Sequence, residues 1–392
     1  MESNAPPCTA GSVNLPTEII IEILCRLPAK SLIRFRCVSK SWCSLIIDSN
    51  FIKKHLSQAR NPANLNLKRA MVYSSSSIHK VWSFPLLSFP SHSIKDAVKL
   101  YPLGKRAGRI AFVEVCNGLF CIWMEGELFL WNPSLRQHKR LQSPVIDTPH
   151  EIGANSFVGV AVCAFGYDPH NDDYKLVRII KFSGRGPVRT ETKIYSLKSD
   201  SWRKIQECPY PFYAKSDGKF ANGSIYWLID SGEATNQASK IISFELSTET
   251  YGELPLPDDH PNGPEIHEFG LAVLRGMLSL YCNYITSHFV LWGMKDANGP
   301  QKCWEKMIGI QYQDVPLQPH SSRACYYIVP RYLFENGEVL LEAKEDDLKG
   351  VLGLYTEKSW GVETKISSGI SYVREVHVYE ETLVSPCLRN GA

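Results

Sequence analysis

The sequence predicts a small all-α module followed by an all-β propeller of six or seven blades. Apolar residues recur at helical spacing between Val13 and Gln58, whereas short apolar or alternating segments bounded by turn residues fill the chain from about residue 68 onward. These later segments form a degenerate repeat of roughly fifty residues, a period typical of propeller blades. At 392 residues the chain also exceeds the usual size of a single core. The expected organisation is a flexible tail at 1–12, the helical module at 13–58, a linker at 59–67 and the propeller at 68–392.

Three short helices are expected in the helical module. Pro16 suits the first position of the first helix, because its φ is already helical and its missing N–H needs no partner there. Pro28 ends that helix, and Ser39 is placed to cap the third. The apolar residues expected on the three helices are Ile19, Ile20, Ile23, Leu24 and Leu27, then Leu32, Ile33 and Phe35, then Trp42, Leu45 and Ile46. About forty residues bury too little surface to fold robustly alone, so this module needs a partner.

The same segment carries a specific motif without an insertion. Its residues are Leu15-Pro16, Glu18-Ile19, Glu22-Ile23-Leu24, Leu27-Pro28, Lys30-Ser31-Leu32, Arg34-Phe35-Arg36, Val38-Ser39-Lys40 and Trp42. This string resembles the F-box motif. The resemblance implies a module that docks on a Skp-type adaptor and so joins a cullin-based ubiquitin ligase. An ordinary helical hairpin within a larger fold is the alternative, because Leu and Ile spacing alone does not separate the two.

The resemblance also implies which residues meet the adaptor. They are Leu15, Pro16, Ile19, Ile23, Leu24, Leu27, Pro28, Leu32, Arg36, Val38, Ser39 and Trp42. The segment from Val13 to Gln58 has a net charge of +4, against +3 for the whole chain. This charge favours an acidic protein partner over nucleic acid, which usually requires a strongly basic domain with Lys and Arg along one face. A solvated helix face accounts for the same charges.

Each repeat of the large domain opens with a turn and an apolar strand. The opening turns are Asn117-Gly118, Asn222-Gly223, Arg275-Gly276 and Asn336-Gly337. The repeats close at Leu141, Ile205, Leu254 and Met307, with steps of about 64, 49 and 53 residues, close to the roughly fifty of kelch-type blades. A four-stranded blade buries its faces only against its neighbours. We therefore expect a complete ring, closed by a C-terminal strand within 373–379.

Six short motifs give a second resemblance. They are Cys116-Asn117-Gly118-Leu119, Trp131-Asn132-Pro133-Ser134, Phe165-Gly166-Tyr167-Asp168, Asp172-Asp173-Tyr174-Lys175-Leu176-Val177, Ser201-Trp202-Arg203 and Asn222-Gly223-Ser224-Ile225-Tyr226-Trp227. With the F-box, they resemble plant F-box proteins that carry a C-terminal F-box-associated interaction domain related to kelch propellers. The sequence departs from a strict kelch repeat, which has a Gly-Gly pair in each blade, because it contains no such pair. The number of blades therefore stays open between six and seven.

Motifs of catalysis and metal binding are absent from the sequence. It contains no GxSxG, HExxH, P-loop or GxGxxG motif, and its histidines are scattered singly. Its twelve cysteines include no CxxC pair, so reduced thiols that pack as small apolar residues are expected. We therefore expect no cofactor and no metal. A signal peptide and an apolar run long enough to span a bilayer are also absent, which predicts a protein of the cytoplasm, the nucleus or both.

The connections between strands are of two kinds. Turns after the first and third strands of a repeat are short, while the other connections are longer, at Ser183 to Glu191, Asp230 to Ser239, Pro257 to His267 and Gln313 to Arg323. In an antiparallel blade the longer connections share one face, and loops of varied length on a rigid scaffold commonly carry recognition. We expect a protein target to bind this face through Arg185, Arg189, Asp258, Asp259 and His260. A solvated loop is the alternative for each of these residues.

These patterns predict the substrate-recognition subunit of a Skp–cullin–F-box ubiquitin ligase, which has no chemistry of its own. Its expected partners are the Skp-type adaptor, through it a cullin, and a protein target. Holding a target lysine near the ubiquitin thioester makes the transfer effectively intramolecular. One alternative is a scaffold that binds the adaptor without promoting degradation. Another is a propeller enzyme, such as a copper oxidase that gathers Tyr, Cys and His ligands at the ring axis.

Overall fold

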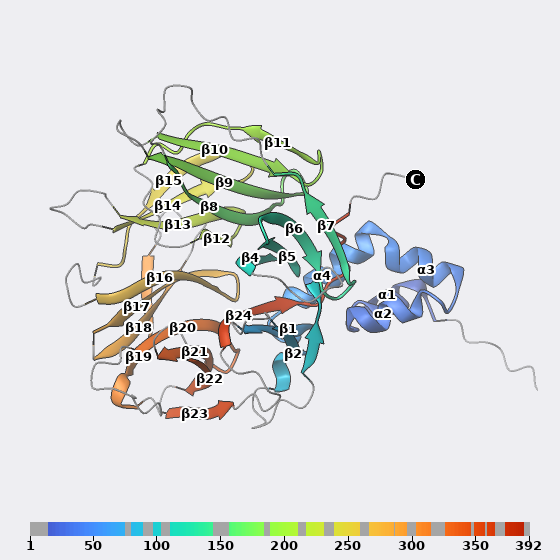
Figure 1. Ribbon diagram of the computed structural model, residues 1–392. Helices are drawn as coiled ribbons and strands as arrows, with labels where there is room; N and C mark the ends of the chain where they lie inside the picture. Colours follow the sequence, from blue (N-terminus) through green and yellow to red (C-terminus); the bar gives the residue numbers. More distant parts are fainter. Residues whose placement is uncertain are drawn as a thin grey trace, which may run out of the picture.

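A module of helices lies on one side of a ring of six four-stranded sheets in the computed structural model (Figure 1). The described residues are 15–74, 80–88, 97–102, 110–143, 157–183, 189–210, 217–230, 239–258, 266–285, 287–295, 303–314, 326–345, 349–356, 359–364 and 373–387. An all-α module followed by an all-β propeller is therefore confirmed. Of the two blade numbers that the sequence allows, the structure has six.

Four helices form the helical module in the described chain. They are α1 (Thr17–Leu24), α2 (Ala29–Phe35), α3 (Lys40–Ile47) and α4 (Ser49–Arg60). Pro16 and Pro28 stand at the N-cap of α1 and α2, so Pro16 precedes the first helical residue instead of occupying that position. The Ser39 hydroxyl accepts a hydrogen bond from the Trp42 backbone N–H at 3.1 Å, which confirms it as the cap of α3.

The fourth helix corrects the prediction of three. The Asp48 carboxylate caps α4 by accepting hydrogen bonds from the backbone N–H groups of Asn50 and Phe51 at 2.9 and 3.1 Å. The buried face of α4 consists of Phe51, His55, Leu56 and Ala59, at helical spacing. The cap and the spacing are both visible in the sequence, but His55 interrupts the apolar pattern on which the prediction rests. A short 3-10 helix, η1 (Leu65–Leu67), then leads into the propeller.

Each blade is an antiparallel sheet of four strands, numbered here around the ring. Blade 1 contains β24 (Val373–Glu380), β1 (Lys68–Ser74), β2 (Lys80–Pro85) and β3 (Val98–Leu100), and blade 2 contains β4 (Ile110–Cys116), β5 (Leu119–Met124), β6 (Glu127–Asn132) and β7 (Gln137–Leu141). Blade 3 contains β8 (Phe157–Asp168), β9 (Asp173–Ser183), β10 (Arg189–Ser196) and β11 (Ser201–Lys204), and blade 4 contains β12 (Lys219–Ala221), β13 (Ser224–Asp230), β14 (Ser239–Glu245) and β15 (Thr250–Leu254). Blade 5 contains β16 (Ile266–Leu274), β17 (Met277–Tyr284), β18 (His288–Lys295) and β19 (Cys303–Gln311), and blade 6 contains β20 (Tyr326–Leu333), β21 (Val339–Glu345), β22 (Lys349–Thr356) and β23 (Ser359–Thr364).

The core of the propeller lies between the blades. Each pair of neighbouring blades encloses its own cluster of buried apolar side chains. Strand β13 shows why its sequence is a continuous apolar run, since Ile225 and Trp227 pack toward blade 3 while Tyr226 and Leu228 pack toward blade 5. Successive side chains of a strand point to opposite faces, and here both faces are buried. A blade is therefore stable only between two neighbours.

The ring closes through a strand from the far end of the chain. Strand β24 pairs antiparallel with β1, with Lys68 opposite Glu380 and Val72 opposite Val376. The prediction that residues near the C-terminus complete the first blade is confirmed. The first strands of the six blades, β24, β4, β8, β12, β16 and β20, contact one another in ring order. These contacts place the first strands at the inner edge of the sheets, around the ring axis.

The repeated turn and the repeated tryptophan have separate structural roles. Asn117 and Gly118 both have positive φ, at 53° and 72°, as a tight turn between twisted antiparallel strands requires. Trp202 and Trp304 lie on the fourth strands of blades 3 and 5. Each indole N–H donates at 2.7 Å to a carbonyl just beyond the fourth strand of the preceding blade, that of Gln142 or Pro255. The turns set the strand pairing, and the tryptophans join neighbouring blades.

The two faces of the ring differ in what covers them. The turns after the first and third strands lie on one face, and the helical module packs against this face at blades 2 and 3 and at the end of β24 (Figure 1). The remaining connections leave the opposite ends of the strands. We call this opposite side the loop face. Blade 2 departs from the expected pattern of long connections there, because only Glu125 and Gly126 separate β5 from β6.

Candidate functional site

Helix α1 presents apolar side chains to solvent. Ile19 and Ile23 lie one turn apart on α1, and Leu15 comes just before the N-cap of the helix. Leu15, Ile19 and Ile23 are 53%, 46% and 50% exposed. We call these three residues the α1 apolar face. Val38, between α2 and α3, is 61% exposed. Solvent-exposed apolar residues aligned on a helix indicate a surface for a partner.

The other predicted adaptor residues divide by burial. Pro16, Arg36 and Ser39 are exposed, and Leu27, Pro28 and Trp42 are partly buried. Leu24 and Leu32 are 2% and 0% exposed, which places them in the core of the helical module and not on its surface. Their physical role in this structure is to hold the helices together, because a side chain sealed within its own module has no surface to offer a partner.

The core of the helical module includes a residue from the other end of the chain. Leu24, Leu32, Ile46 and Phe51 pack with Leu383, which follows β24. Leu383 is 6% exposed. Leu383 was not singled out by the sequence reasoning, and no local pattern identifies it, because its partners are more than three hundred residues away. The module thus completes its core with the C-terminal segment.

Polar contacts from α4 join the module to two propeller turns. The Lys53 ammonium donates to Asp172 at 2.6 Å, and Arg60 Nε donates to Asn117 Oδ1 at 3.0 Å. Asn117 in turn donates through Nδ2 to the Tyr174 hydroxyl at 3.0 Å. The hydrogen bonds that Asp172 accepts, from Lys53 and then from Tyr167, lower its pKa. The Asn117-Gly118 turn was predicted from the sequence, whereas the contact of both turns with α4 depends on the tertiary structure.

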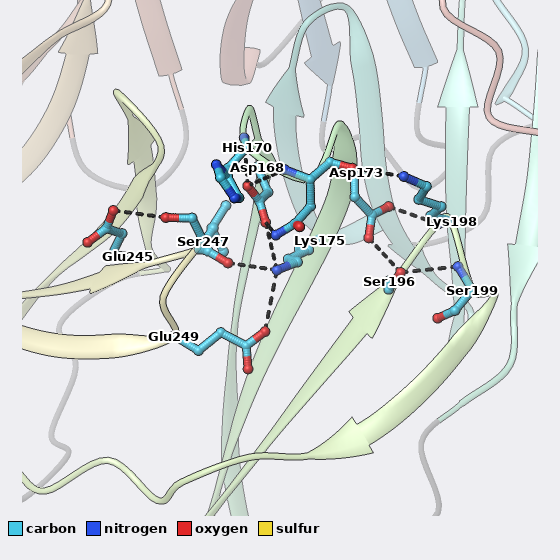
Figure 2. A network of polar contacts seen from close by, with 12 residues as sticks. Asp168, His170, Asp173, Lys175, Ser196, Lys198, Ser199, Glu245, Ser247 and Glu249 are labelled. Atoms are coloured by element: carbon cyan, nitrogen blue, oxygen red, sulfur yellow. Dashed lines mark hydrogen bonds and ion pairs between the residues drawn. The ribbon is translucent and has the colours of Figure 1, made fainter.

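Polar residues of the Asp168–Lys175 motif join blade 3 to blade 4 (Figure 2). Lys175 is buried, and its ammonium donates to Asp168 at 2.8 Å, to the Leu246 carbonyl at 2.7 Å and to Glu249 at 3.3 Å. Burial alone raises the pKa of Asp168, but hydrogen bonds from Lys175 and Asn171 outweigh it, and the net pKa is lowered. Every charge in this network is compensated within the fold. These residues therefore have a structural role, which is to hold blade 3 against blade 4.

Charged side chains also gather on the inner strands. Lys219 of β12 donates to Glu114 of β4 at 2.6 Å, which links blades 2 and 4, and Glu375 and His377 of β24 lie 3.3 Å apart. Burial, followed by the charge of Glu114, raises the pKa of Asp217 to about 6. Within the described ranges, no group of three or more His, Cys, Asp or Glu residues is placed to hold a metal ion. The contacts instead connect blades across the ring.

The predicted target contacts can be located only in part. Asp258 is exposed in the turn that follows β15, and Arg189 is the first residue of β10, where its backbone pairs with Phe182. Both lie at the loop face. Arg185, Asp259 and His260 lie outside the described residues, as do most residues of the four long connections. Among described residues, Ile285 between β17 and β18 is an exposed apolar side chain on this face.

The helices that the structure describes include none long and apolar enough to cross a membrane.

The fold agrees with the comparisons to known proteins. Residues 13–54 match the F-box domain, and residues 68–384 match the F-box associated beta propeller domain. The chain therefore belongs to the F-box proteins that carry an F-box-associated β-propeller. It is 31% identical to the F-box/kelch-repeat protein At3g23880 of Arabidopsis thaliana, over 95% of this chain and 96% of that one. It is 29% identical to the F-box protein CPR1 of the same plant, over 85% and 81% of the two chains.

Solved structures resemble the chain more distantly. The hydrazine synthase of Kuenenia stuttgartiensis matches 83% of this chain and 48% of its own, with 9% identity and a TM-score of 0.46.

Proposed function

We propose that this chain is the substrate-recognition subunit of a Skp–cullin–F-box ubiquitin ligase. In this proposal the F-box docks on a Skp-type adaptor and through it on a cullin, while the loop face binds a protein target for ubiquitination and degradation. The chain itself is not the catalyst. It positions the target lysine near the ubiquitin thioester, which makes the transfer effectively intramolecular.

The α1 apolar face is the observation that carries the proposal. Leu15, Ile19 and Ile23 remain about half exposed although the F-box has a complete core that does not use them. Burying an apolar side chain of this size contributes about 1.5–3 kcal/mol relative to leaving it exposed. A partner that covers all three therefore gains enough free energy for specific docking. The family of the chain makes a Skp-type adaptor the candidate for that partner.

The position of the F-box supports a role in presentation. It packs against the face of the short turns, so the loop face points away from it. Adaptor and target can therefore bind at the same time without competing for surface. We place the target contacts at the loop face, with Asp258, Arg189, Arg185, Asp259 and His260 as candidates.

Two finer assignments belong to the same proposal. We assign the propeller to the kelch-repeat type, on the repeat of roughly fifty residues and on the name of the relative that is 31% identical. We also place the protein in the cytoplasm, the nucleus or both, because its scattered cysteines without CxxC pairs are typical of reducing compartments.

A matched pair of variants tests adaptor binding. Leu15→Ala/Pro16→Ala removes one end of the α1 apolar face, and we expect the Kd for a purified Skp-type adaptor to rise at least tenfold, or about 1.4 kcal/mol. Leu87→Ala is the control, because Leu87 in η2 (Leu86–Ser88) is also 53% exposed but belongs to blade 1. Isothermal titration calorimetry measures both. Equal Kd values for the double variant and the wild type would contradict the proposal.

A second experiment separates the ligase from a scaffold. Proximity labelling with proteasome inhibition identifies proteins bound by the full chain, and their turnover is compared in cells that express the chain with or without residues 13–58. In a ligase receptor, targets bind both forms but are degraded only with the full chain. Targets whose turnover is the same with both forms favour the scaffold.

A further inference from the structure

We propose that residues Glu381–Val384, which we call the clamp segment, hold the F-box in one fixed orientation on the propeller. The clamp segment follows β24 and passes between the two domains. Its purpose rests on the proposed function, since a ligase subunit must keep its adaptor and target surfaces at a set distance and angle. The physical claim of a fixed joint does not depend on that function.

Glu381 completes an F-box helix that lacks its own cap. Helix α2 is preceded by Pro28, whose side chain accepts no hydrogen bond. Glu381 Oε2 instead accepts a hydrogen bond from the backbone N–H of Ala29, the first residue of α2, at 3.1 Å. A carboxylate at this position satisfies an otherwise unpaired N–H and favours the positive end of the helix dipole. Its other oxygen, Oε1, lies 3.4 Å from Arg69 Nη1 on β1, so the side chain contacts both domains.

Leu383 makes the apolar half of the same contact. It is 6% exposed and packs with Leu24, Leu32 and Phe51 in the core of the F-box. The neighbouring Val384 packs on the other side, against the cluster between blades 2 and 3. Consecutive residues of the clamp segment thus pack against two different domains.

Two sequence motifs of blade 2 hold the backbone of the clamp segment. Asn132 is fully buried, and its Nδ2 donates to the carbonyls of Thr382 and Val384 at 3.1 and 2.7 Å. Gly118 leaves room for the segment, because a Cβ there would lie 2.3 Å from the Glu380 carbonyl and 2.4 Å from Thr382 Cγ2. Glu381 N also donates to the Leu67 carbonyl at 2.8 Å. The segment is therefore fixed to the propeller before it reaches the F-box.

The contacts between the F-box and the propeller differ in how strongly they restrain the orientation of the F-box. The ion pair of Lys53 with Asp172 is more than half exposed on both sides and contributes little on its own. The contacts of Glu381 and Leu383 restrain the F-box more than this ion pair does, since neither group can separate from the F-box without exposing apolar surface or an unpaired N–H. They act on α2 and on the core of the F-box, whereas the hydrogen bonds of Lys68 with the Ala59 carbonyl and of Arg60 with Asn117 fix only the end of α4. Loss of the clamp segment should free the F-box to reorient while both domains stay folded.

The distance between the domains tests the joint directly. Two exposed native cysteines, Cys37 in the F-box and Cys303 on β19, can carry spin labels after Cys8, Cys43, Cys325 and Cys387 are changed to Ser. We expect pulsed electron resonance to give a narrow distance distribution in the full chain. Glu381→Ala/Leu383→Ala should broaden it, whereas Val384→Ala, which trims the propeller side of the same segment, should leave it narrow.

A surrogate target tests the purpose of the joint. Replacing residues 259–265 by a peptide epitope lets a matching single-domain antibody serve as the substrate in a reconstituted Skp–cullin ligase. The clamp variant should lower kcat for ubiquitin transfer roughly tenfold, because misplacement acts on the geometry of transfer. KM for the antibody and Kd for the adaptor should stay unchanged. Leu383→Ile alone, with Glu381 intact, should leave kcat close to the wild-type value, since it keeps the buried volume.

The distance distribution, kcat and adaptor binding each test a different part of the proposal. A distribution that stays narrow in the clamp variant overturns the joint, and an unchanged kcat with a broadened distribution overturns its role in transfer. If Leu383→Ala unfolds the F-box, seen as lost protection of its amides from hydrogen exchange, Glu381→Ala alone carries the test with the same two criteria. If the wild type binds no adaptor, the proposed function fails, but the distance measurement still decides the joint.

Discussion

Ile23 and Leu24 are neighbours in α1 with opposite surroundings. Ile23 is half exposed, whereas Leu24 is sealed in the core of the F-box. Successive residues of a helix point about 100° apart, so one apolar run can serve two surfaces. At the scale of single residues, the F-box motif therefore combines buried core positions with exposed apolar positions, and the motif alone does not say which is which.

Two truncations should separate these roles. Leu32→Ala removes a fully buried side chain and should lower the free energy of unfolding of the F-box by about 2–5 kcal/mol. Ile23→Ala should change it by less than about 0.5 kcal/mol, because the side chain is half exposed and lies outside the core of the F-box, and should instead weaken adaptor binding. Hydrogen exchange of the α1–α3 amides in the full chain measures the stability. Equal destabilisation by the two changes would show that α1 is packed differently.

The turns of the propeller act as elements of assembly. In the turn after β8, the Asp168 carboxylate accepts a hydrogen bond from the backbone N–H of His170. Asp172 of the same turn contacts α4 through Lys53. Lys175, which follows the turn, joins blade 3 to blade 4 (Figure 2). One short connection therefore contacts the F-box and a neighbouring blade. The charged residues of the Asp168–Lys175 motif connect elements of the fold, and each has a hydrogen-bond or ion-pair partner there.

Removing Lys175 should destabilise the propeller in a pH-dependent way. Lys175→Met leaves the carboxylate of Asp168 buried without its cation, which typically costs about 3–5 kcal/mol. In the wild type the pKa of Asp168 is lowered, so its stabilising effect is present above the pKa of the unfolded chain, about 3.9, and is lost as the pH falls through the lower folded value. Without Lys175, burial raises that pKa and protonation relieves the cost.

The melting temperature of Lys175→Met should therefore fall furthest below that of the wild type near pH 7. The difference should become smaller as the pH approaches 4. Differential scanning calorimetry at both pH values measures it. Lys240→Met on β14 is the control, because Lys240 contacts Glu253 at the surface. A difference that is constant with pH would mean that Lys175 acts through packing alone.

The whole molecule depends on closing a ring. Strand β24 supplies Val376 to the core shared with blade 6 and Tyr379 to the core shared with blade 2. Because the blades are stabilised only by their neighbours, loss of one inner strand opens two interfaces. The same strand ends where the clamp segment begins, so ring closure and placement of the F-box are coupled.

A chain that ends at Ser371 should fail to form a stable propeller. It lacks β24 and exposes the edge of β1 and two apolar cores. We expect aggregation, or a melting temperature far below that of the full chain. The matched control ends at Cys387, which keeps β24 and the clamp segment. Unchanged solubility and melting of the shorter chain would require a ring that closes in another way.

The two domains should also be separable in function. A fragment without residues 1–58 retains all six cores between blades, and we expect it to fold and to hold the target without presenting it for ubiquitination. When overexpressed, it should compete with the full receptor and make the target accumulate. Immunoblotting of a target found by proximity labelling measures this, and target levels that do not rise would count against the separation.

Local signals predicted much of this architecture. The cap at Ser39, the turn at Asn117-Gly118 and the repeat of apolar strands are short-range patterns, and the structure bears them out. The α1 apolar face was predicted as part of a larger set that also included Leu24 and Leu32. Helical periodicity identifies apolar positions but not their surroundings, so the exposed and buried members could be told apart only in the folded chain.

The sequence by itself determined the two domains and the propeller repeat, because both follow from residue spacing that repeats over short distances. It also predicted the closing strand, because a repeat of this kind is stable only as a closed ring. Only the tertiary structure decided the number of blades, the exposure of α1 and the placement of Leu383 in the F-box core. The physical reason is that these features depend on contacts between residues far apart in the chain. Glu381 and Ala29 are separated by 352 positions, and no local pattern in either segment encodes the hydrogen bond that joins them.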